Sequence, residues 1–236
     1  MNIMASNIVR VETRGAFTKT LVLNRPDKAN AMNGELVQRL TEEIVKCYSD
    51  QTKLLIIRGE GKHFCSGFDR DPEAFKSAAS RGLLGVEIES MLQIVAGAPC
   101  VTLAHIHGAA VGGGADLAVA CDYRCATADA SMSFPGFNLI GVSLGNSRLS
   151  QRIGPDQAMK LILQAKRVGA HEAFKLGLVT NVIEKDAIEE LTAELEGALE
   201  ETPKDAVRSL KQSVRQVTSR AFGPDISSDH ILSASS

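Results

Sequence analysis

Three consecutive glycines, Gly112 to Gly114, stand just ahead of an apolar run in the segment IHGAAVGGGADLAVACD, residues 106–122. Each glycine weakens a helix by about 1 kcal/mol relative to alanine, so such a run needs a reason. Either the backbone is packed too closely for a β-carbon, or its N–H groups are exposed to a ligand. The residue types alone leave both explanations open.

A second glycine-bearing loop follows an apolar strand in RGEGKHFCSGFDRD, residues 58–71. The loop at Gly112 begins a predicted helix, whose first N–H groups have no partner within the helix. Two backbone donors that converge on one point form an oxyanion hole, in which each donor contributes about 3 kcal/mol to lowering a barrier. The segment GAAVGGG does not fit the dinucleotide-binding glycine pattern, and the chain has no Walker loop, so neither nucleotide site is predicted.

Candidate acid–base groups lie close to both loops. Asp116 falls in the first turn of the predicted helix, where it is either a proton-transfer group or a carboxylate that the helix dipole favours by about 0.3–1 kcal/mol. Asp69 follows the other loop and is expected to brace it. Glu87 and Glu89 are expected on a solvated helical face, although either could supply an acid.

The remaining candidates are expected to be structural. A lone histidine beside a strand is usually a hydrogen-bonded structural residue, which is the expectation for His63, His105 and His107. No partner pattern marks a nucleophile among the residues beside the first loop, Cys65 and Ser66. Two arginines near residue 150 could contact a phosphate or form a subunit interface, and the interface is the favoured reading for Arg148 and Arg152.

Strands that alternate with helices must position these groups. Two β-branched segments, residues 7–15 and 17–26, predict a hairpin joined at Arg14–Gly15. Asn33 is predicted to cap a helix over residues 34–49. Further strands are predicted at 53–61, 100–108, 123–130 and 177–185, which indicates β-α-β units around a largely parallel core. Two amphipathic helices follow from Asp186, broken at Thr202–Pro203, and the polar residues 223–236 are expected to fray.

Composition excludes several functional classes. With 236 residues and 44% hydrophobic content, the chain can bury a core in one large domain or in one domain plus an appendage. Twenty-six basic against 28 acidic residues predict no nucleic-acid partner and no anionic membrane partner. No segment has the length of a membrane span or the apolar core of a signal peptide, so a cytoplasmic protein is expected. Five cysteines without a C-x-x-C pair predict buried free thiols and no metal site.

Four segments, in this order and spacing, resemble the enoyl-CoA hydratase/isomerase (crotonase) superfamily: LNRPDKANAMN, LLIIRGEGKHFCSGFD, IHGAAVGGGADLAVACDYRCATADASMSFP and RIGPDQAMKLILQAKRVGAHEAFKLGLVTNVI. The resemblance covers about residues 8–184. It implies an α/β protein with the ClpP/crotonase fold: a crotonase-like ββα spiral core over 1–184, and a shortened C-terminal helical trimerisation region over 185–236. It also implies an acyl-CoA thioester substrate, a homotrimer or a dimer of trimers, and no separate cofactor, because CoA is part of the substrate.

The resemblance also assigns binding residues. The backbone N–H groups of Phe68 and Gly113 would hold the thioester carbonyl oxygen. The residues that would line the CoA side of the site are Lys28, Ala29 and Ala31. The residues that would follow the adenine and pantetheine are Phe68, Asp69, Arg70 and Asp71.

The family's acid–base pair is broken in this chain. Asp116 stands where hydratases of the family carry the first of two glutamates, and its side chain is one methylene shorter. A displacement of that size can change a rate by about a hundredfold. The second glutamate is missing, because Gly136, or Phe137 with a one-residue shift, occupies its position.

Three functions remain open from the sequence. The first is an enoyl-CoA hydratase-like lyase that works with one carboxyl group. The second is another reaction of an acyl-CoA, either double-bond isomerisation or decarboxylation. The third is a non-catalytic acyl-CoA-binding paralogue, for which loss of an acid would be expected.

Overall fold

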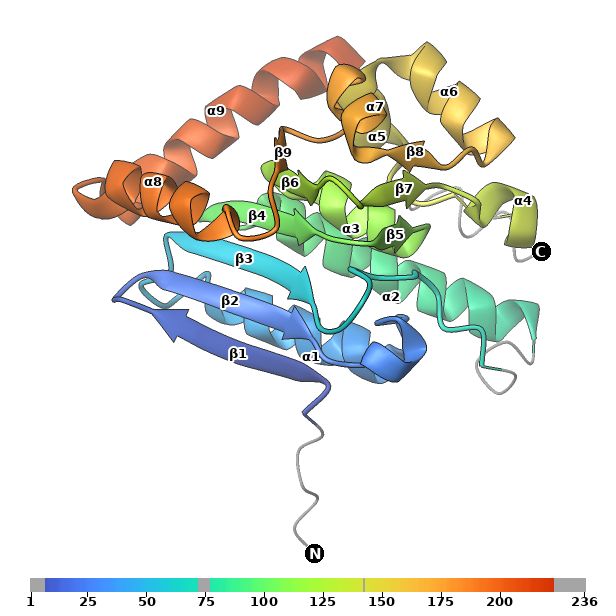
Figure 1. The fold of residues 1–236 in the computed structure, drawn as a ribbon, viewed down its shortest axis with the longest axis horizontal. Helices are drawn as coiled ribbons and strands as arrows, with labels where there is room; N and C mark the ends of the chain where they lie inside the picture. Colours follow the sequence, from blue (N-terminus) through green and yellow to red (C-terminus); the bar gives the residue numbers. More distant parts are fainter. Residues whose placement is uncertain (1–6, 72–76, 142, 223–236) are drawn as a thin grey trace, which may run out of the picture.

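A six-stranded sheet forms the centre of the protein in the computed structural model, which describes residues 7–71, 77–141 and 143–222, with side chains up to residue 215 (Figure 1). Its strands lie in the order β1-β2-β3-β4-β6-β9, and all neighbours are parallel except β1 and β2. Their bounds are β1 Val9–Arg14, β2 Thr18–Leu23, β3 Leu54–Gly59, β4 Val101–Ile106, β6 Tyr123–Thr127 and β9 Asn181–Ile183. A smaller sheet has the order β5-β7-β8, with β5 Ala109–Val111, β7 Ser131–Ser133 and β8 Val168–Gly169.

Several local predictions are confirmed. The predicted hairpin is the antiparallel β1–β2 pair, in which Arg14 lies opposite Thr18. Asn33 caps α1 (Gly34–Lys46), because its side chain accepts the N–H of Leu36 at 2.9 Å. The helix ends three residues before the predicted boundary, since residues 47–49 continue only as turns.

The last predicted strand is shorter than the sequence indicated. Gly177 has φ +77°, and the N–H groups of Leu178 and Val179 both donate to the carbonyl of Ala173. These residues therefore close the end of α7 (Ala170–Lys175), and the strand β9 begins only at Asn181.

The two faces of the large sheet bury cores of different size. In β3, Leu55 and Ile57 belong to the main core, whereas Leu54 and Ile56 belong to a small second cluster, as the alternation of a strand requires. Helices α1, α2 (Ala78–Gly97) and α3 (Gly113–Ala120) cover the main core (Figure 1). Helix α8 (Ile188–Glu200) and the start of α9 (Lys204–Phe222) cover the small cluster.

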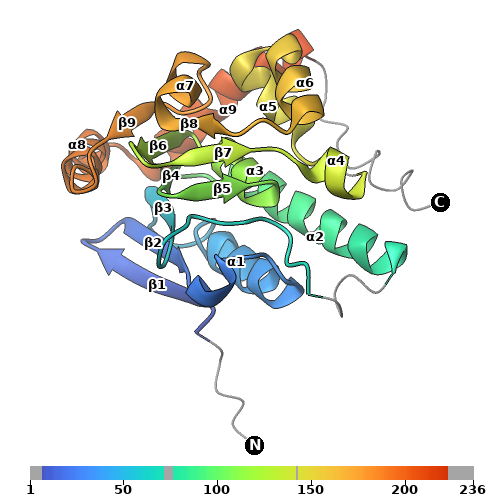
Figure 2. The ribbon, with the colours of Figure 1, turned by 45° about the vertical axis from the view of Figure 1, so that its right-hand side comes forward.

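Short helices surround the smaller sheet. Helix α4 (Gly136–Ile140) follows β7 and packs against α6 (Pro155–Gln164), while α5 (Asn146–Ile153) packs against both α3 and α6 (Figure 2). The residues between β7 and α5 therefore lie beside the first turns of α3, next to the two glycine-bearing loops.

Three further expectations can be compared with the structure. All five cysteines are buried and free, as predicted. Within the described ranges, no helix is long and apolar enough to cross a membrane. The predicted fraying of residues 223–236 lies outside the described residues.

Candidate active site

The two glycine-bearing loops lie side by side. Cys65 pairs with Ala110 in a parallel bridge, and the Val111 N–H donates to the Cys65 carbonyl at 2.9 Å. Gly67 has φ +81°, and a β-carbon there would lie 2.4 Å from the Val111 oxygen and 3.0 Å from the Gly113 nitrogen. Only glycine fits this approach, which brings Phe68 beside the first residue of α3.

The three consecutive glycines serve different purposes. Gly112 has φ +51° and ψ −123°, a conformation that L side chains rarely adopt. At Gly114 a β-carbon would lie 2.2 Å from the Cys65 oxygen, so close packing requires glycine there. Gly113 has room for a β-carbon, 3.5 Å from Met32 Sδ, and as the first residue of α3 its N–H has no acceptor within the helix. Packing and an available N–H group therefore both explain the run.

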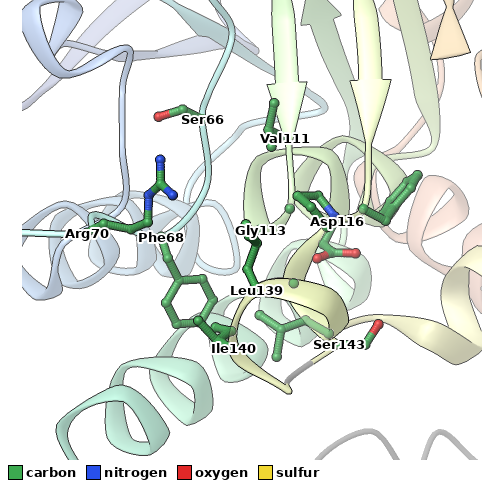
Figure 3. Close-up of a pocket in the computed structure, with 14 residues that line it drawn as sticks. Ser66, Phe68, Arg70, Val111, Gly113, Asp116, Leu139, Ile140 and Ser143 are labelled. Carbon is green, nitrogen blue, oxygen red and sulfur yellow. The ribbon is translucent and has the colours of Figure 1, made fainter. Parts of the chain in front are cut away.

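A cavity of about 120 Å³ lies against these loops (Figure 3). Phe68 and Gly113 both line it, together with Arg70, Asp116 and Gly136. Figure 3 shows Phe68 and Arg70 on one side and Asp116 on the other, with Leu139 and Ile140 between them. The remaining lining residues are Ser66, Val111, Gly112, Phe134, Pro135, Ser143 and Leu144. The sequence-predicted oxyanion pair and the predicted acid thus meet at one cavity.

Asp116 is the buried carboxyl group of this cavity, with a residue exposure of 5%. Burial raises its pKa well above the usual 3.8; the Arg148 guanidinium opposes that rise, and the Glu89 carboxylate adds to it. Among the described residues, no hydrogen bond stabilises the charged form of Asp116. Burial of Asp116 therefore favours its protonated form, whereas a carboxylate that only caps the helix needs its charge to interact with the dipole.

Two expectations about neighbouring residues are wrong. Glu89 is 1% exposed instead of lying on a solvated face, because α2 turns it toward α5. It accepts a 2.7 Å hydrogen bond from Arg148 Nη2, and Arg148 is also buried, at 8% exposure, so this arginine is not a surface interface residue. Glu87 is exposed, as expected. Arg152 donates to the Cys121 carbonyl, away from the cavity.

The two candidate positions of the missing second acid differ in their place relative to the cavity. Gly136 lines the cavity, whereas Phe137 points to the surface and is 49% exposed. Apolar side chains of Phe134, Leu139 and Leu144 form much of this wall. Among the described lining residues, Asp116 is the single carboxyl group.

The loop predicted to line the CoA side does not reach this cavity. Lys28 is exposed at the end of the short 3₁₀ helix Pro26–Lys28, and Ala29 accepts the Ser66 N–H at 3.0 Å. Ala31 is buried and accepts a hydrogen bond from Arg25. This loop contacts the Ser66 loop, so its contact with CoA stays a prediction, as does that of Asp71, which does not line the cavity.

Asp69 braces the loop, as expected. Its carboxylate forms a 2.7 Å ion pair with Arg25 and accepts the Asp71 N–H at 3.2 Å. Sequence reasoning missed a second brace, Asn30, which is fully buried with φ +56°. Its Nδ2 donates to the carbonyls of Glu60, His63 and Phe64. An asparagine between two alanines in DKANAM was the signal available, since asparagine tolerates a left-handed backbone.

His63 and His107 are hydrogen-bonded, as expected, whereas the expectation is wrong for His105, whose Nε2 is buried without a hydrogen-bond partner among the described residues. His63 Nδ1 accepts the Ala109 N–H at 3.2 Å, and His107 Nε2 lies 3.1 Å from the Gly61 oxygen. His105 lines a different cavity, and burial lowers its pKa to about 4. Burial raises the pKa of the Cys65 thiol to about 12, which disfavours the nucleophilic thiolate.

Comparison with known proteins adds independent support. A family model described as enoyl-CoA hydratase/isomerase matches residues 18–230. A Bacillus subtilis protein named "Probable enoyl-CoA hydratase" is 33% identical over 168 residues, which cover 70% of this chain and 65% of the relative. The ethylmalonyl-CoA decarboxylase of Mus musculus is 32% identical over 202 residues, covering 82% of this chain and 62% of that protein. The chain thus spans less than two thirds of these two relatives.

Solved structures give the same result for the fold. Enoyl-CoA hydratase from Bacillus anthracis superposes with a TM-score of 0.83 at 26% identity, covering 97% of this chain and 89% of that one. Enoyl-CoA hydratase from Thermoplasma volcanium has a TM-score of 0.80 at 28% identity, covering 96% and 90%. These likenesses confirm the predicted crotonase-type α/β fold. With the family model matching most of the sequence, the chain belongs to the enoyl-CoA hydratase/isomerase family.

Proposed function

We propose that the protein is an acyl-CoA lyase of the enoyl-CoA hydratase type, in which one neutral carboxyl group, Asp116, transfers the protons. The observation that supports this proposal most directly is the placement of Asp116 in the same cavity as the Phe68 and Gly113 backbones. The thioester carbonyl would accept hydrogen bonds from these two N–H groups, which would stabilise the enolate that forms beside it.

A neutral carboxyl group can serve both proton transfers of a hydration. It has an O–H that donates and a second oxygen that accepts. As water forms the O–C bond at the β-carbon, its proton would pass to the acceptor oxygen of Asp116. The O–H proton of Asp116 would pass to the α-carbon, which leaves Asp116 neutral at the end. No second acid is then needed at Gly136.

Decarboxylation is the second candidate, and the apolar wall of the cavity favours it. The wall formed by Leu139, Ile140 and Leu144 offers a substrate carboxylate no hydrogen bond from a side chain, so the charged group would be destabilised there. Neutral CO₂ carries no charge and would not have this desolvation cost. The bond from the α-carbon to the carboxylate would break, its electron pair would form the enolate, and Asp116 would protonate the α-carbon before regaining a proton from water. The mouse relative is named for a reaction of this class.

The two reactions are separated by their products. The purified protein would be given crotonyl-CoA, with loss of enoyl absorbance as readout, and separately an alkylmalonyl-CoA, with CO₂ release as readout. Asp116→Asn is the control, because it replaces a neutral acid by a neutral amide of the same shape. We expect hydration that the Asn variant abolishes. CO₂ release alone would assign decarboxylation, and binding of both thioesters without turnover would overturn the enzymatic proposal in favour of an acyl-CoA-binding protein.

The assembly belongs to the same proposal. A homotrimer, or a dimer of trimers, would cover apolar side chains that are exposed in the single chain, among them Phe137, Leu139, Met159 and Leu163. Light scattering of the purified protein tests this directly, and a monomeric mass would contradict it.

A further inference from the structure

We propose that Glu89 is a positioning residue for proton transfer: it holds the Arg148 guanidinium in a buried ion pair and thereby keeps that cation from pairing with Asp116. This inference rests on the proposed role of Asp116. It assigns a function to a carboxylate on α2 that does not line the cavity and would not touch the substrate.

The three charged or ionisable groups meet around Gly145. Its N–H lies 3.3 Å from Glu89 Oε2, which also accepts the 2.7 Å hydrogen bond from Arg148 Nη2. The β-carbon position of Gly145 lies 3.3 Å from Asp116 Oδ1 and 3.1 Å from Arg148 Nη2. Gly145 has φ +60°, so the chain turns sharply at this point before α5 begins. The absence of a side chain at Gly145 thus lets Asp116 and Arg148 approach each other across it.

The ion pair decides which carboxyl group carries the negative charge. A buried arginine needs an ionised partner, and among the described residues Glu89 and Asp116 are the carboxyl groups near Arg148. Glu89 takes that place, supported by a further hydrogen bond from Gln93 Nε2 at 3.3 Å. Asp116 has no ion partner among the described residues, and the negative charge of Glu89 adds to the effect of burial in raising its pKa. If Glu89 were removed, Arg148 would turn to Asp116 and ionise it.

The other described charged groups on the elements around Asp116 are either exposed or hydrogen-bonded to other residues. On α2, Glu87 is exposed, and on α5, Arg152 donates to the Cys121 carbonyl. Across the cavity, Arg70 is exposed and Asp69 pairs with Arg25. On β4, His105 lines a cavity with residues of β1 and α8. Among the described residues, the Glu89–Arg148 pair is therefore the charged pair that acts on Asp116.

The test is a direct titration of the Asp116 carboxyl group by NMR, with ¹³C-labelled aspartate in the full chain and Asp116→Asn to assign its resonance. Glu89→Gln should lower the pKa of Asp116 by about 1–3 pH units. The variant removes the repulsion by the Glu89 carboxylate and frees the Arg148 guanidinium to pair with Asp116. The matched control is Glu87→Gln, which removes the same charge from the exposed face of the same helix and should leave the titration unchanged.

The same change also has a kinetic signature. The pH above which kcat/KM falls should move downward in Glu89→Gln together with the Asp116 titration, which a purely structural defect would not cause. An unchanged Asp116 titration in folded Glu89→Gln overturns the inference. Because the NMR readout requires no turnover, it also separates failure of this inference from failure of the proposed reaction.

A second background keeps the test decisive if Glu89→Gln does not fold. Removing both charges of a buried pair is milder than removing one. In an Arg148→Met background, Glu89→Gln should leave the pKa of Asp116 unchanged, because the cation that would ionise Asp116 is absent and a buried carboxyl group without its cation does not keep its charge. A fall in the pKa of Asp116 when Glu89→Gln is added to Arg148→Met would contradict the proposal, because Arg148 would then not be the group that ionises Asp116.

Discussion

The two sides of the cavity are built by different means. On one side, Phe68 and Gly113 contribute backbone groups, and glycines at 67, 112 and 114 place them. On the other side, Asp116 contributes a side chain, whose protonation depends on Glu89 and Arg148 from two other helices. The backbone side is determined by local conformation and close packing. The acid side is determined by electrostatics between segments that are far apart in the sequence, so the two sides should respond differently to substitution.

The largest effect is expected on the acid side. Asp116→Asn should lower kcat by about 10²–10⁴-fold, because the amide cannot transfer a proton. Its free energy of unfolding at neutral pH should not fall, since burial favours the neutral form of Asp116, which Asn matches in charge and shape. Kinetics with crotonyl-CoA or an alkylmalonyl-CoA, and urea denaturation, measure the two quantities. A comparable loss of activity and of stability would mean that Asp116 has a structural role instead.

On the backbone side, the glycines should differ from one another. Gly114→Ala should cost about 1–3 kcal/mol of stability, because its β-carbon would meet the Cys65 oxygen at 2.2 Å. Gly113→Ala should leave stability unchanged or raise it by up to about 1 kcal/mol, since the contact there is ordinary and alanine favours helix. Urea denaturation of the two variants checks the contrast. If Gly114→Ala and Gly113→Ala were equally stable, the loop that carries Cys65 would have to move away from α3 to make room for the new β-carbon.

The pH dependence of the free energy of unfolding should report the ionisation of Asp116 separately from the packing of the glycine-bearing loops. Folding raises the pKa of Asp116 above its value of 3.8 in the unfolded chain. Its contribution to the free energy of unfolding is therefore complete below pH 3.8, and it is lost as the pH rises toward the pKa of the folded state. Between these two pKa values, the free energy of unfolding of the wild type should fall relative to that of Asp116→Asn by about 1.4 kcal/mol for each unit of pH increase. Urea denaturation at a series of pH values measures the slope. A flat difference would mean that Asp116 is ionised in the folded protein.

The smallest effect is expected from restoring a second acid. Gly136→Glu should raise the rate of crotonyl-CoA hydration by at least about tenfold. This is less than the ~10²–10⁴-fold of an evolved acid–base group, because no neighbouring residue orients the new carboxyl group. Gly136→Gln, which has the same shape without the carboxyl group, is the matched control. If both variants behave alike, the cavity wall and not the missing acid limits the reaction.

This contrast also explains how far the sequence could be read. The hairpin, the Asn33 cap and the parallel core follow from local patterns, whereas Phe68 and Gly113 were assigned by the resemblance to the family, because glycine spacing alone left packing and ligand binding both open. Glu89 was misplaced because a mixed apolar and polar pattern along α2 gives no sign of which face meets α5. Arg148 was assigned to an interface for the same reason. Asn30 was missed because its role depends on three carbonyl groups that only the folded loop brings together.

The unequal cores on the two faces of the large sheet have a consequence for how the protein opens. Helix α8 and the start of α9 rest on a small apolar cluster, and lysines tie them to backbone carbonyls, as Lys53 does at Leu199 and Lys204 at Cys47. Helix α3 lies within the main core. Hydrogen exchange should therefore show α8 opening as a separate cooperative unit, at a lower free energy than α3. Thermal motion would uncover the back of the sheet while the cavity on the other side stays assembled.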